Sequence, residues 1–410
     1  MNDRIILHCD CNSFFASVET VLEPRYKNVP MAVCGDVERR HGIILAKNEL
    51  AKKYGIQTAE TVYSAKKKCP QLVLASPHYD EYVKYSRMAN EIYARYTDMI
   101  ESFGIDESWL DVTASGIFGT GYEIAEKIRR QIKEELGITV SIGVSFNKVF
   151  AKLGSDYKKP DAITVISREN YKDIVLPLPV STLLFVGKKT TEALKTLGIR
   201  TIGDLAAASR ELLSLKLGKA GEQLSKYARA EDDSPVASVD AHESKSLGNG
   251  FTFKHDLVGR EECRVGINYL AEEIGTKLRI RGQKCAGVQL SIKDEFLRTI
   301  QRNAIIDPPT DISAEIAARA FEILCKEWSS ERPVRMITVT ATNLIRKENV
   351  YEQIDLFGED NSSKREKDGK REIAVDEIRK KFGIESITRA SIIDNDLGIG
   401  QKNNKKDGDR

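Results

Sequence analysis

The sequence predicts a multidomain protein of the α+β class, and three observations lead to this prediction. The chain has 410 residues, more than one hydrophobic core usually supports, so we expect roughly two to four domains. Residues 4–146 have the pattern strand, helix, hairpin, helix, strand, which is a split βαβ layout. Residues 250–342 have the pattern βαββαβ, and the segment 177–230 between these units is small and helical.

The composition is that of an ordinary globular protein, with 41% hydrophobic and 30% charged residues. The 63 basic and 61 acidic residues give a net charge of +2, which argues neither for nor against nucleic acid unless the charges segregate on the surface. Seven cysteines without a Cys-x-x-Cys pair, and only five histidines, argue against a zinc site or a disulfide framework. The N-terminal apolar run is too short for a signal peptide or a membrane span, so we expect a cytoplasmic protein.

The first predicted strand is an unbroken apolar run that ends at Asp10. Such a run is typical of a central strand buried on both faces. Asn12 or Ser13 can cap the helix that follows, and a helix N-terminus beside a metal-bound acid is a suitable phosphate site. The neighbouring aromatic side chains, Phe14 and Phe15, belong either to the core or to this site.

The stretch Glu101–Val112 places two adjacent acids, Asp106 and Glu107, at a predicted turn between two strand-forming runs. Gly104 favours that turn, which lets both carboxylates converge on one site. At about 4 Å and an effective dielectric of roughly 20, two carboxylates repel by on the order of 4 kcal/mol, so both stay ionised only beside a cation. Oxygen ligands select magnesium or a similar hard ion. The alternative is that both acids are ordinary solvated turn residues.

The last strand of this unit, at residues 138–146, alternates in hydrophobicity and is predicted to be half-buried. Lys148 and Lys152 follow it, four residues apart on one face of a predicted helix, and Lys159 precedes Pro160 at a turn. These lysines are either solvated or directed at a triphosphate.

Two later segments carry residues suited to DNA. Gly187 opens a predicted helix that continues with Lys188, and backbone N–H groups there can bind a DNA phosphate. Residues 231–243 are polar and form a predicted linker. Beyond it, Arg298 and Arg302 lie on one face of a predicted strand, where they suit backbone contact along a groove.

From residue 346 onward the chain is highly charged, and we expect most of it to be disordered, most clearly from Asp360 to Lys370. Gln353–Phe357 is a short apolar segment in this tail. It is typical of a peptide that docks into a partner's pocket, although chance hydrophobic residues give the same pattern. Ile373–Ala390 can form a small helix and turn of unknown purpose.

Three motifs occur together, in the order and at the spacing of a known protein family. They are Asp10-Cys-Asn-Ser-Phe-Phe15, Gly104-Ile-Asp-Glu-Ser-Trp-Leu-Asp-Val112, and Ser145-Phe-Asn-Lys-Val-Phe-Ala-Lys152 through Lys159-Pro160. With these motifs the chain resembles the Y-family of translesion DNA polymerases, the bacterial DNA polymerase IV and UmuC group, over residues 4–345. The resemblance implies a ferredoxin-like palm at 1–24 and 77–165, fingers at 25–76, a helical thumb with a helix-hairpin-helix at 166–230, a linker at 231–243, a βαββαβ little finger at 244–345 and a tail at 346–410.

The resemblance also implies an activity. This is template-directed, error-prone DNA synthesis across damaged bases, in which the 3′-hydroxyl of primer-template DNA attacks a deoxynucleoside triphosphate by two-metal phosphoryl transfer. Two magnesium ions would be held by Asp10, Asp106, Glu107 and the main-chain carbonyl of Cys11. Of these, Glu107 would face the primer hydroxyl.

On the nucleotide side, the resemblance places the backbone amides of Phe14 and Phe15 and the ammonium of Lys159 at the phosphates. The Phe15 ring would block a ribose 2′-hydroxyl. The fingers of the family often supply a hydroxyl residue and an arginine where this chain has Ala46 and Lys52, and lysine cannot repeat the fork of arginine. Nucleotide affinity and fidelity therefore stay open.

Asn12 stands where an acid is common in the polymerase IV branch, so the branch, and any need for activating partners, stays open.

The tail carries a segment that resembles the family's motif for binding a replication sliding clamp, with Gln353, Asp355, Leu356 and Phe357. Such a motif would tether the enzyme, which we expect to be a monomer, at the primer end.

Two other hypotheses about the function of these residues stay open at this point. A nucleotide cyclase also places acids on a hairpin of a palm-like fold for two-metal chemistry, although it has no need of DNA-binding segments. A clamp-tethered DNA-binding adaptor with a silent site is the non-enzymatic alternative, although the presence of all three acids argues against it.

Overall fold

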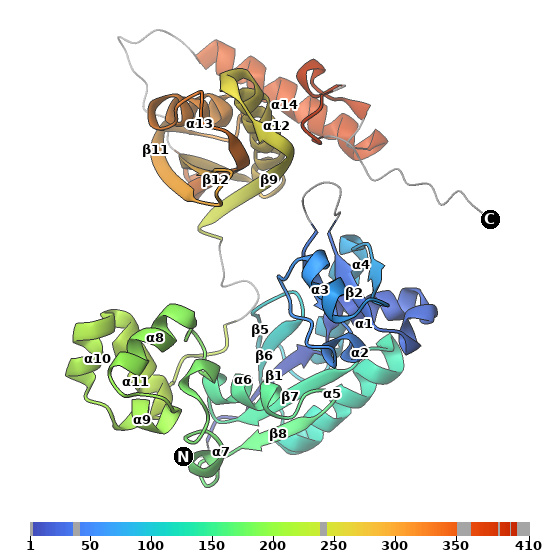
Figure 1. The fold of residues 1–410 in the computed structure, drawn as a ribbon, viewed down its shortest axis with the longest axis vertical. Coiled ribbons are helices and arrows are strands. Elements are labelled where there is room, and N and C mark those ends of the chain that lie inside the picture. Colours follow the sequence, from blue (N-terminus) through green and yellow to red (C-terminus); the bar gives the residue numbers. More distant parts are fainter. Residues whose placement is uncertain are drawn as a thin grey trace. The chain divides into compact units, whose positions relative to one another are not determined.

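The computed structural model describes residues 3–35, 42–237, 244–350, 362–383, 386–393 and 395–399. The chain forms two compact units, which Figure 1 draws as ribbons. The first comprises Met1–Gly35 and Ile43–His242, and the second includes Glu243–Arg410. Among the described residues, the first unit contains two sheets and the second contains one. Within the described ranges, no helix has the length and apolar character needed to cross a membrane.

A five-stranded sheet of order β5-β6-β1-β7-β8 forms the centre of the first unit. Its strands are β1 (Ile6–Cys11), β5 (Ile100–Ser102), β6 (Glu107–Asp111), β7 (Val140–Ser145) and β8 (Ile163–Ile166). β1 pairs antiparallel with both β6 and β7, so the first strand is central, as its apolar run predicted. The β5-β6 hairpin therefore lies directly beside the strand that ends in Asp10 and Cys11.

Helices pack on both faces of this sheet. On one face, α1 (Phe14–Leu22), α4 (Tyr79–Tyr93) and α5 (Gly121–Leu136) share a hydrophobic core with the strands. On the other face, α6 (Lys148–Tyr157) approaches β7 so closely that a Cβ on Gly143 would lie 1.8 Å from the carbonyl oxygen of Ala151. β7 is therefore buried along its whole length. The prediction of a half-buried strand is wrong because the alternating pattern does not reveal the second helix layer.

A three-stranded sheet of order β3-β2-β4 is inserted between α1 and α4. The elements of the insertion are η1 (Pro24–Asn28), β2 (Met31–Cys34), β3 (Ile44–Lys47), α2 (Glu49–Lys52), α3 (Val62–Lys68) and β4 (Val73–Ala75). Buried side chains that include Ile44, Ala51 and Leu72 form a small core of its own.

A helical segment follows β8. Its elements are α7 (Tyr171–Ile174), η3 (Val180–Thr182), α8 (Lys188–Thr196), α9 (Ile202–Ala207), α10 (Arg210–Leu217) and α11 (Lys219–Ala228). Their apolar side chains form a core that also receives Phe146 and Phe150 from the chain around the start of α6. Gly187 is the N-cap residue of α8 and Lys188 is its first residue, as predicted.

The second unit contains a four-stranded antiparallel sheet of order β11-β10-β12-β9. Its elements in chain order are β9 (Ser246–Leu257), α12 (Gly259–Ile280), β10 (Gln283–Lys293), β11 (Thr299–Thr310), α13 (Ser313–Glu327) and β12 (Val334–Arg346). This order confirms the predicted βαββαβ layout. α12 and α13 pack on one face of the sheet, where Val288, Leu290 and Val339 are buried.

The structure corrects the prediction that Arg298 and Arg302 share one face of a strand. Arg298 lies in the turn before β11, which begins at Thr299. Arg302 pairs across the sheet with the core residue Leu290, and its guanidinium donates to Glu327 of α13 at 2.9 Å. Because cross-strand partners share a face, Arg302 is on the side that the helices cover.

The tail contains a long helix, α14 (Ser362–Phe382), which packs against α12 (Figure 1). The guanidinium of Arg279 in α12 lies 3.0 Å from the carboxylate of Glu372 and 2.5 Å from that of Asp376. The prediction of disorder from Asp360 to Lys370 is therefore wrong from residue 362 onward. The reason is that ion pairs, rather than an apolar stripe visible in the sequence, hold this helix.

The rest of the tail is described in part. The predicted helix and turn at Ile373–Ala390 begins inside α14, and the short helix η7 (Ala390–Ile392) follows. Ile392, Leu397 and Ile399 are buried in the core of the second unit. The predicted clamp segment, Gln353–Phe357, lies outside the described residues.

Candidate active site

The end of β1 and the start of β6 bring the predicted acids to one edge of the sheet. Asp10 and Glu107 are direct partners in the antiparallel pairing of these strands. Cys11 donates its backbone N–H to the carbonyl oxygen of Asp106 at 3.0 Å, and Phe103 donates its own to the carbonyl oxygen of Glu107 at 2.9 Å, which closes the hairpin turn. The acids therefore come from adjacent central elements, as the split βαβ layout predicted.

Lysines from α6 and from the turn after it neutralise two of these acids. Lys159 Nζ lies 2.6 Å from Asp10 Oδ2, and Lys152 Nζ lies 2.9 Å from Glu107 Oε2 and 3.7 Å from Asp10 Oδ2. All four side chains are largely shielded from solvent, and Lys159 is the most exposed at 30%. Shielding strengthens such pairs, because the effective dielectric is lower than in water.

Lys148 takes a different direction from Lys152. Its ammonium donates to both carboxylate oxygens of Glu101 at 2.6 and 2.7 Å. Glu101 also accepts the backbone N–H of Ala237 at 2.7 Å. Lys148 and Glu101 therefore attach the start of the predicted linker to the central sheet, and Lys148 is not directed at the acids.

Burial and the lysines act on the carboxylates in opposite directions. Burial raises the pKa of Asp10 to about 7, against the pull of Lys159. Burial likewise raises the pKa of Asp106, and the charge of Glu107 adds to that rise. Burial also raises the pKa of Glu107, but its contacts with His8 and Lys152 prevail and hold that pKa below its usual range. Glu107 is therefore the most firmly charged of the three acids.

The chemistry of these donors fits a hard cation. The described residues contain no group of three or more His, Cys, Asp or Glu side chains already arranged to hold a metal ion. The carboxylates of Asp10 and Glu107 nevertheless supply the oxygen ligands that magnesium prefers, and both already bind ammonium groups. A magnesium ion at this position would replace part of the contacts of Lys152 and Lys159.

His8, which the sequence analysis did not single out, lies beside Glu107. It is fully buried, and its Nδ1 lies 2.8 Å from Ser155 Oγ. The Ser155 hydroxyl also lies 2.8 Å from the carbonyl oxygen of Lys152, to which it can donate. Burial lowers the pKa of His8 to about 4. His8 Nε2 lies 3.7 Å from Glu107 Oε2, beyond hydrogen-bond distance, and it has no hydrogen-bond partner in the described structure.

The two aromatic residues after Asp10 have different surroundings. Phe14 is 3% exposed and belongs to the core. Phe15 is half-buried, and its ring stacks on Tyr82 with centroids 4.1 Å apart and an interplanar angle of 10°. The Tyr82 hydroxyl donates to the buried carboxylate of Glu19. The Phe15 ring is therefore held in one orientation, with part of its surface open.

The start of α1 differs from the predicted capped helix. Ser13 is the N-cap residue in the left-handed region at φ 49°, and neither it nor Asn12 caps through its side chain. Instead, Ser13 Oγ donates to Glu49 Oε1 at 3.1 Å, and the same oxygen pairs with Lys52. Lys52 is thus engaged with Glu49 at the start of α2.

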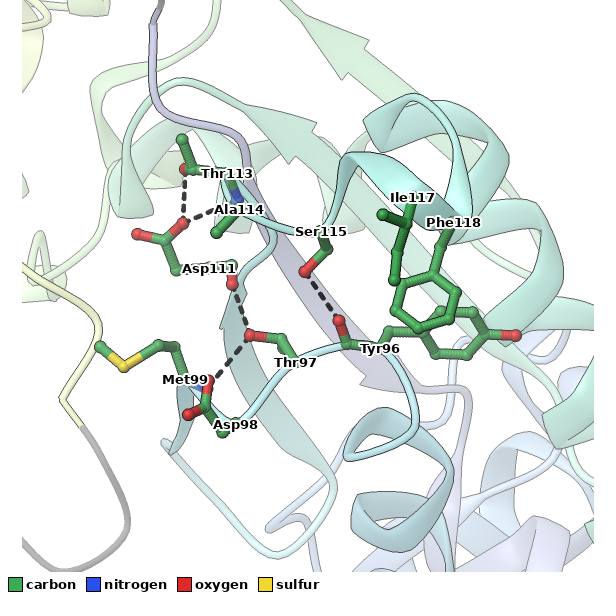
Figure 2. Close-up of a pocket in the computed structure, with 10 residues that line it drawn as sticks. All are labelled: Tyr96, Thr97, Asp98, Met99, Asp111, Thr113, Ala114, Ser115, Ile117 and Phe118. Carbon is green, nitrogen blue, oxygen red and sulfur yellow. Dashed lines mark hydrogen bonds between the residues drawn. The ribbon is translucent and has the colours of Figure 1, made fainter.

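A separate cavity lies at the opposite end of β6 from Glu107. Its volume is about 520 Å³, and Asp111 at the end of the strand lines it together with residues of the segments 96–99 and 113–118. Figure 2 shows that hydrogen bonds within these segments, such as Ser115 Oγ to the carbonyl oxygen of Tyr96 at 2.7 Å, frame the cavity. None of the predicted site residues lines it.

Comparison with known proteins shows the family to which the chain belongs. The model of the impB/mucB/samB family matches residues 9–156, and that of the family's C-terminal domain matches residues 244–356. The chain belongs to this family, the Y-family DNA polymerases. The matched region begins just before Asp10 and ends in α6, so it contains all three acids and Lys152.

This Y-family polymerase is similar to relatives along nearly its whole length. It is 47% identical over 400 residues to the DNA polymerase IV of Acetivibrio thermocellus, covering 97% of this chain and 99% of the relative. It is 36% identical to DNA polymerase IV 1 of Bacillus subtilis, covering 95% and 93%. Among solved structures, the Y-family DNA polymerase chimera Dbh-Dpo4(243-245)-Dbh matches with a TM-score of 0.74 and 26% identity, covering 83% of this chain and 99% of the chimera.

Family membership decides between the alternatives that the sequence left open. The chain is a DNA polymerase, and neither the nucleotide cyclase nor the silent adaptor is retained. The family match in the second unit also covers the βαββαβ layout, which a cyclase has no need of.

Proposed function

We propose that this polymerase extends primers across damaged template bases by two-metal phosphoryl transfer. The observation that carries the proposal is the pairing of Asp10 with Glu107 across β1 and β6, beside Lys159. In this proposal residues 1–24 and 77–165, with the five-stranded sheet, are the palm, and residues 25–76 are the fingers. The helical segment at 166–230 is the thumb, and residues 244–345 of the second unit are the little finger. Each of these has its own core in the structure, which supports the division.

The carboxylates of Asp10, Asp106 and Glu107, with the carbonyl of Cys11, would hold two magnesium ions. When bound, these ions lower the pKa of the primer 3′-hydroxyl and neutralise the triphosphate and the leaving pyrophosphate. The low pKa of Glu107 keeps one carboxylate charged toward the primer side. Lys159 would transfer from Asp10 to the triphosphate once the metal charge replaces its own.

The start of α1 is the proposed nucleotide contact. The backbone amides of Phe14 and Phe15 are in the first turn of the helix, where N–H groups lack intrahelical partners and favour phosphate. The Phe15 ring, held against Tyr82, would occupy the space of a ribose 2′-hydroxyl. Lys52 pairs with Glu49, which in turn accepts a hydrogen bond from Ser13 at the start of this helix. We propose that Lys52 contacts the triphosphate weakly.

For DNA, we propose contacts at the N-terminus of α8, from Gly187 and Lys188, and on the sheet of the second unit. The sheet face opposite α12 and α13 carries polar side chains, which suit contact with a nucleic-acid backbone. Its polar side chains are Gln289, Ser291, Gln301, Asn303, Thr338 and Thr340. Arg298, in the turn beside this face, remains a proposed contact, whereas the ion pair of Arg302 with Glu327 makes a direct role less favourable.

The tail is the proposed attachment to a sliding clamp through Gln353, Asp355, Leu356 and Phe357. A tether of this kind raises the effective concentration of the enzyme at the primer end. It would offset a salt-sensitive grip on DNA.

The proposal is tested by magnesium-dependent primer extension on undamaged and lesion-containing templates. We expect extension past at least one lesion that stops a replicative polymerase. Replacing both Asp106 and Glu107 with alanine should abolish extension on every template. Extension that survives this double replacement would refute the assignment of the active centre.

A further inference from the structure

Asn12 lies between the elements that form the active site, and we propose that it is the positioning residue for Lys159. This inference rests on the proposed role of Lys159 at the triphosphate. Asn12 is 5% exposed and follows Asp10 by two residues. Its backbone N–H donates to the carbonyl oxygen of Thr139 at 2.9 Å, and its own carbonyl accepts from Ser17 Oγ at 2.6 Å. The residue thus fixes the junction between β1 and α1.

One orientation of the Asn12 side-chain amide satisfies all of its neighbours. In it, the amide oxygen accepts from the Thr139 hydroxyl at 3.0 Å, from the backbone N–H of Asp161 at 3.1 Å and from that of Val140 at 3.3 Å. The amide nitrogen then donates to Ser141 Oγ at 2.8 Å. The opposite orientation turns the amide nitrogen toward the N–H groups, so the choice follows from hydrogen bonding. The bond to Asp161 joins the end of β1 to the turn that carries Lys159.

α5 also holds this turn. Asp161 has φ 52°, and its carboxylate accepts from Arg129 at 2.9 Å and from Lys133 at 2.8 Å. Arg129 also donates to the Asp161 carbonyl at 3.3 Å. Asp161 is therefore held by three groups. Its carboxylate and its carbonyl bind α5, and its backbone N–H binds Asn12. A turn held at three points delivers the Lys159 ammonium to the acids with little loss of freedom on binding.

Asn12 also explains how the turn is anchored without more negative charge. An aspartate at this position would accept the same N–H groups, but it would place another carboxylate beside Asp10. A neutral amide keeps the anchor and leaves the charge of the site to the three acids. Asn12 touches neither metal nor nucleotide in this account, and it acts only through the Lys159 turn.

The test is a double-mutant cycle on single-nucleotide incorporation by the full-length enzyme with magnesium and primer-template DNA. We expect Asn12→Ala to raise KM for the deoxynucleotide about tenfold, the scale of leaving a buried N–H group without its acceptor, with a smaller change in kcat. Lys159→Ala should raise KM at least as much. Because Asn12 acts through Lys159, the double variant should be no worse than Lys159→Ala alone. Asn170→Ala, which removes another backbone-bonding asparagine amide at α7, is the matched control and should leave KM unchanged.

Two outcomes would contradict the inference, and they are distinguishable. If Lys159→Ala leaves KM unchanged, the proposed role of Lys159 is wrong and the inference falls with it. If Lys159→Ala raises KM but the effects of the two replacements on KM multiply in the double variant, Lys159 keeps its role and Asn12 is only structural. Asn12→Ser, which retains a hydroxyl at this position, provides the same cycle if Asn12→Ala does not fold.

Discussion

Asp10 and Glu107 face each other across β1 and β6, and the ammonium of Lys152 lies within 3.7 Å of both carboxylates. Together with Lys159, this lysine offsets the repulsion between the two acids in the absence of metal. In the proposed mechanism, metal ions would compete with these lysines for the same carboxylate oxygens, and this competition would have measurable consequences.

Replacing Lys159 with methionine should tighten metal binding when no nucleotide is present. The change removes the ammonium 2.6 Å from Asp10 Oδ2, so a divalent cation meets a more negative site. We expect Mn²⁺ affinity to rise by about tenfold, the scale of one such interaction, in isothermal titration. Lys84→Met, which removes an exposed lysine paired with Glu81, is the control and should leave affinity unchanged. Equal or weaker Mn²⁺ binding by the Lys159 variant would show that the lysine does not compete with metal.

Replacing Phe15 with alanine should admit ribonucleotides. The ring is fixed by its stacking on Tyr82, so its removal would open space at the proposed position of the sugar, away from the acids. We expect the ratio of kcat/KM for a deoxynucleotide to that for the matching ribonucleotide to fall at least about tenfold. Tyr63→Ala, at an exposed aromatic residue of the insertion, should keep the wild-type ratio. Unchanged discrimination in the Phe15 variant would remove its proposed gating role.

Gly143→Ala should destabilise the first unit by about 3 kcal/mol through overpacking. The new Cβ would lie 1.8 Å from the carbonyl oxygen of Ala151 and 2.6 Å from the backbone nitrogen of Ser155. At Gly116 a Cβ meets nothing within 4 Å, so Gly116→Ala should change the free energy of unfolding by only about 0.5 kcal/mol. Urea unfolding followed by the fluorescence of buried Trp109, in a Trp328→Phe background, reports on this unit. Equal midpoints for the two variants would mean that α6 does not pack tightly on β7.

Deleting residues 353–357 should abolish binding to a sliding clamp and leave distributive synthesis intact. These residues include the apolar side chains of the proposed motif, whereas the acids are in the first unit. Surface plasmon resonance with immobilised clamp measures the first effect, and primer extension without clamp measures the second. Deleting residues 403–407, a polar stretch of equal length near the C-terminus, is the control. Clamp binding that persists after the first deletion would refute the motif.

The sequence predicted the parts of the site that depend on strand order and missed those that depend on packing. An apolar run ending in Asp10 and a hairpin carrying Glu107 are sufficient to place the two acids on neighbouring strands. The sequence analysis did not identify His8, because a histidine inside an apolar run is most simply a core residue. Only the structure shows that its Nε2 is directed at Glu107. Lys148 and Lys152 share a helix face in sequence, yet Glu101 draws Lys148 away from the acids.

In the second unit, too, the sequence predicted the order of the elements but not the contacts between them. The βαββαβ order was readable from hydrophobic periodicity, but the start of β11 was not, and this error placed Arg298 in a strand. The first half of α14 was predicted to be disordered, because the helix is held by ion pairs of Glu372 and Asp376 with Arg279 of another helix. Long-range ion pairs of this kind leave no periodic signal in the sequence.

The most direct test of the central claim is the single-turnover rate of magnesium-dependent primer extension in Asp10→Asn and Glu107→Gln. Both changes keep the shape of the side chain and remove its charge. We expect each to lower the rate on the order of a thousandfold while folding and DNA binding persist. Asp111→Asn, at the other end of β6, should stay within about twofold of the parent enzyme. A rate within about tenfold of the parent in either active-site variant would contradict the account.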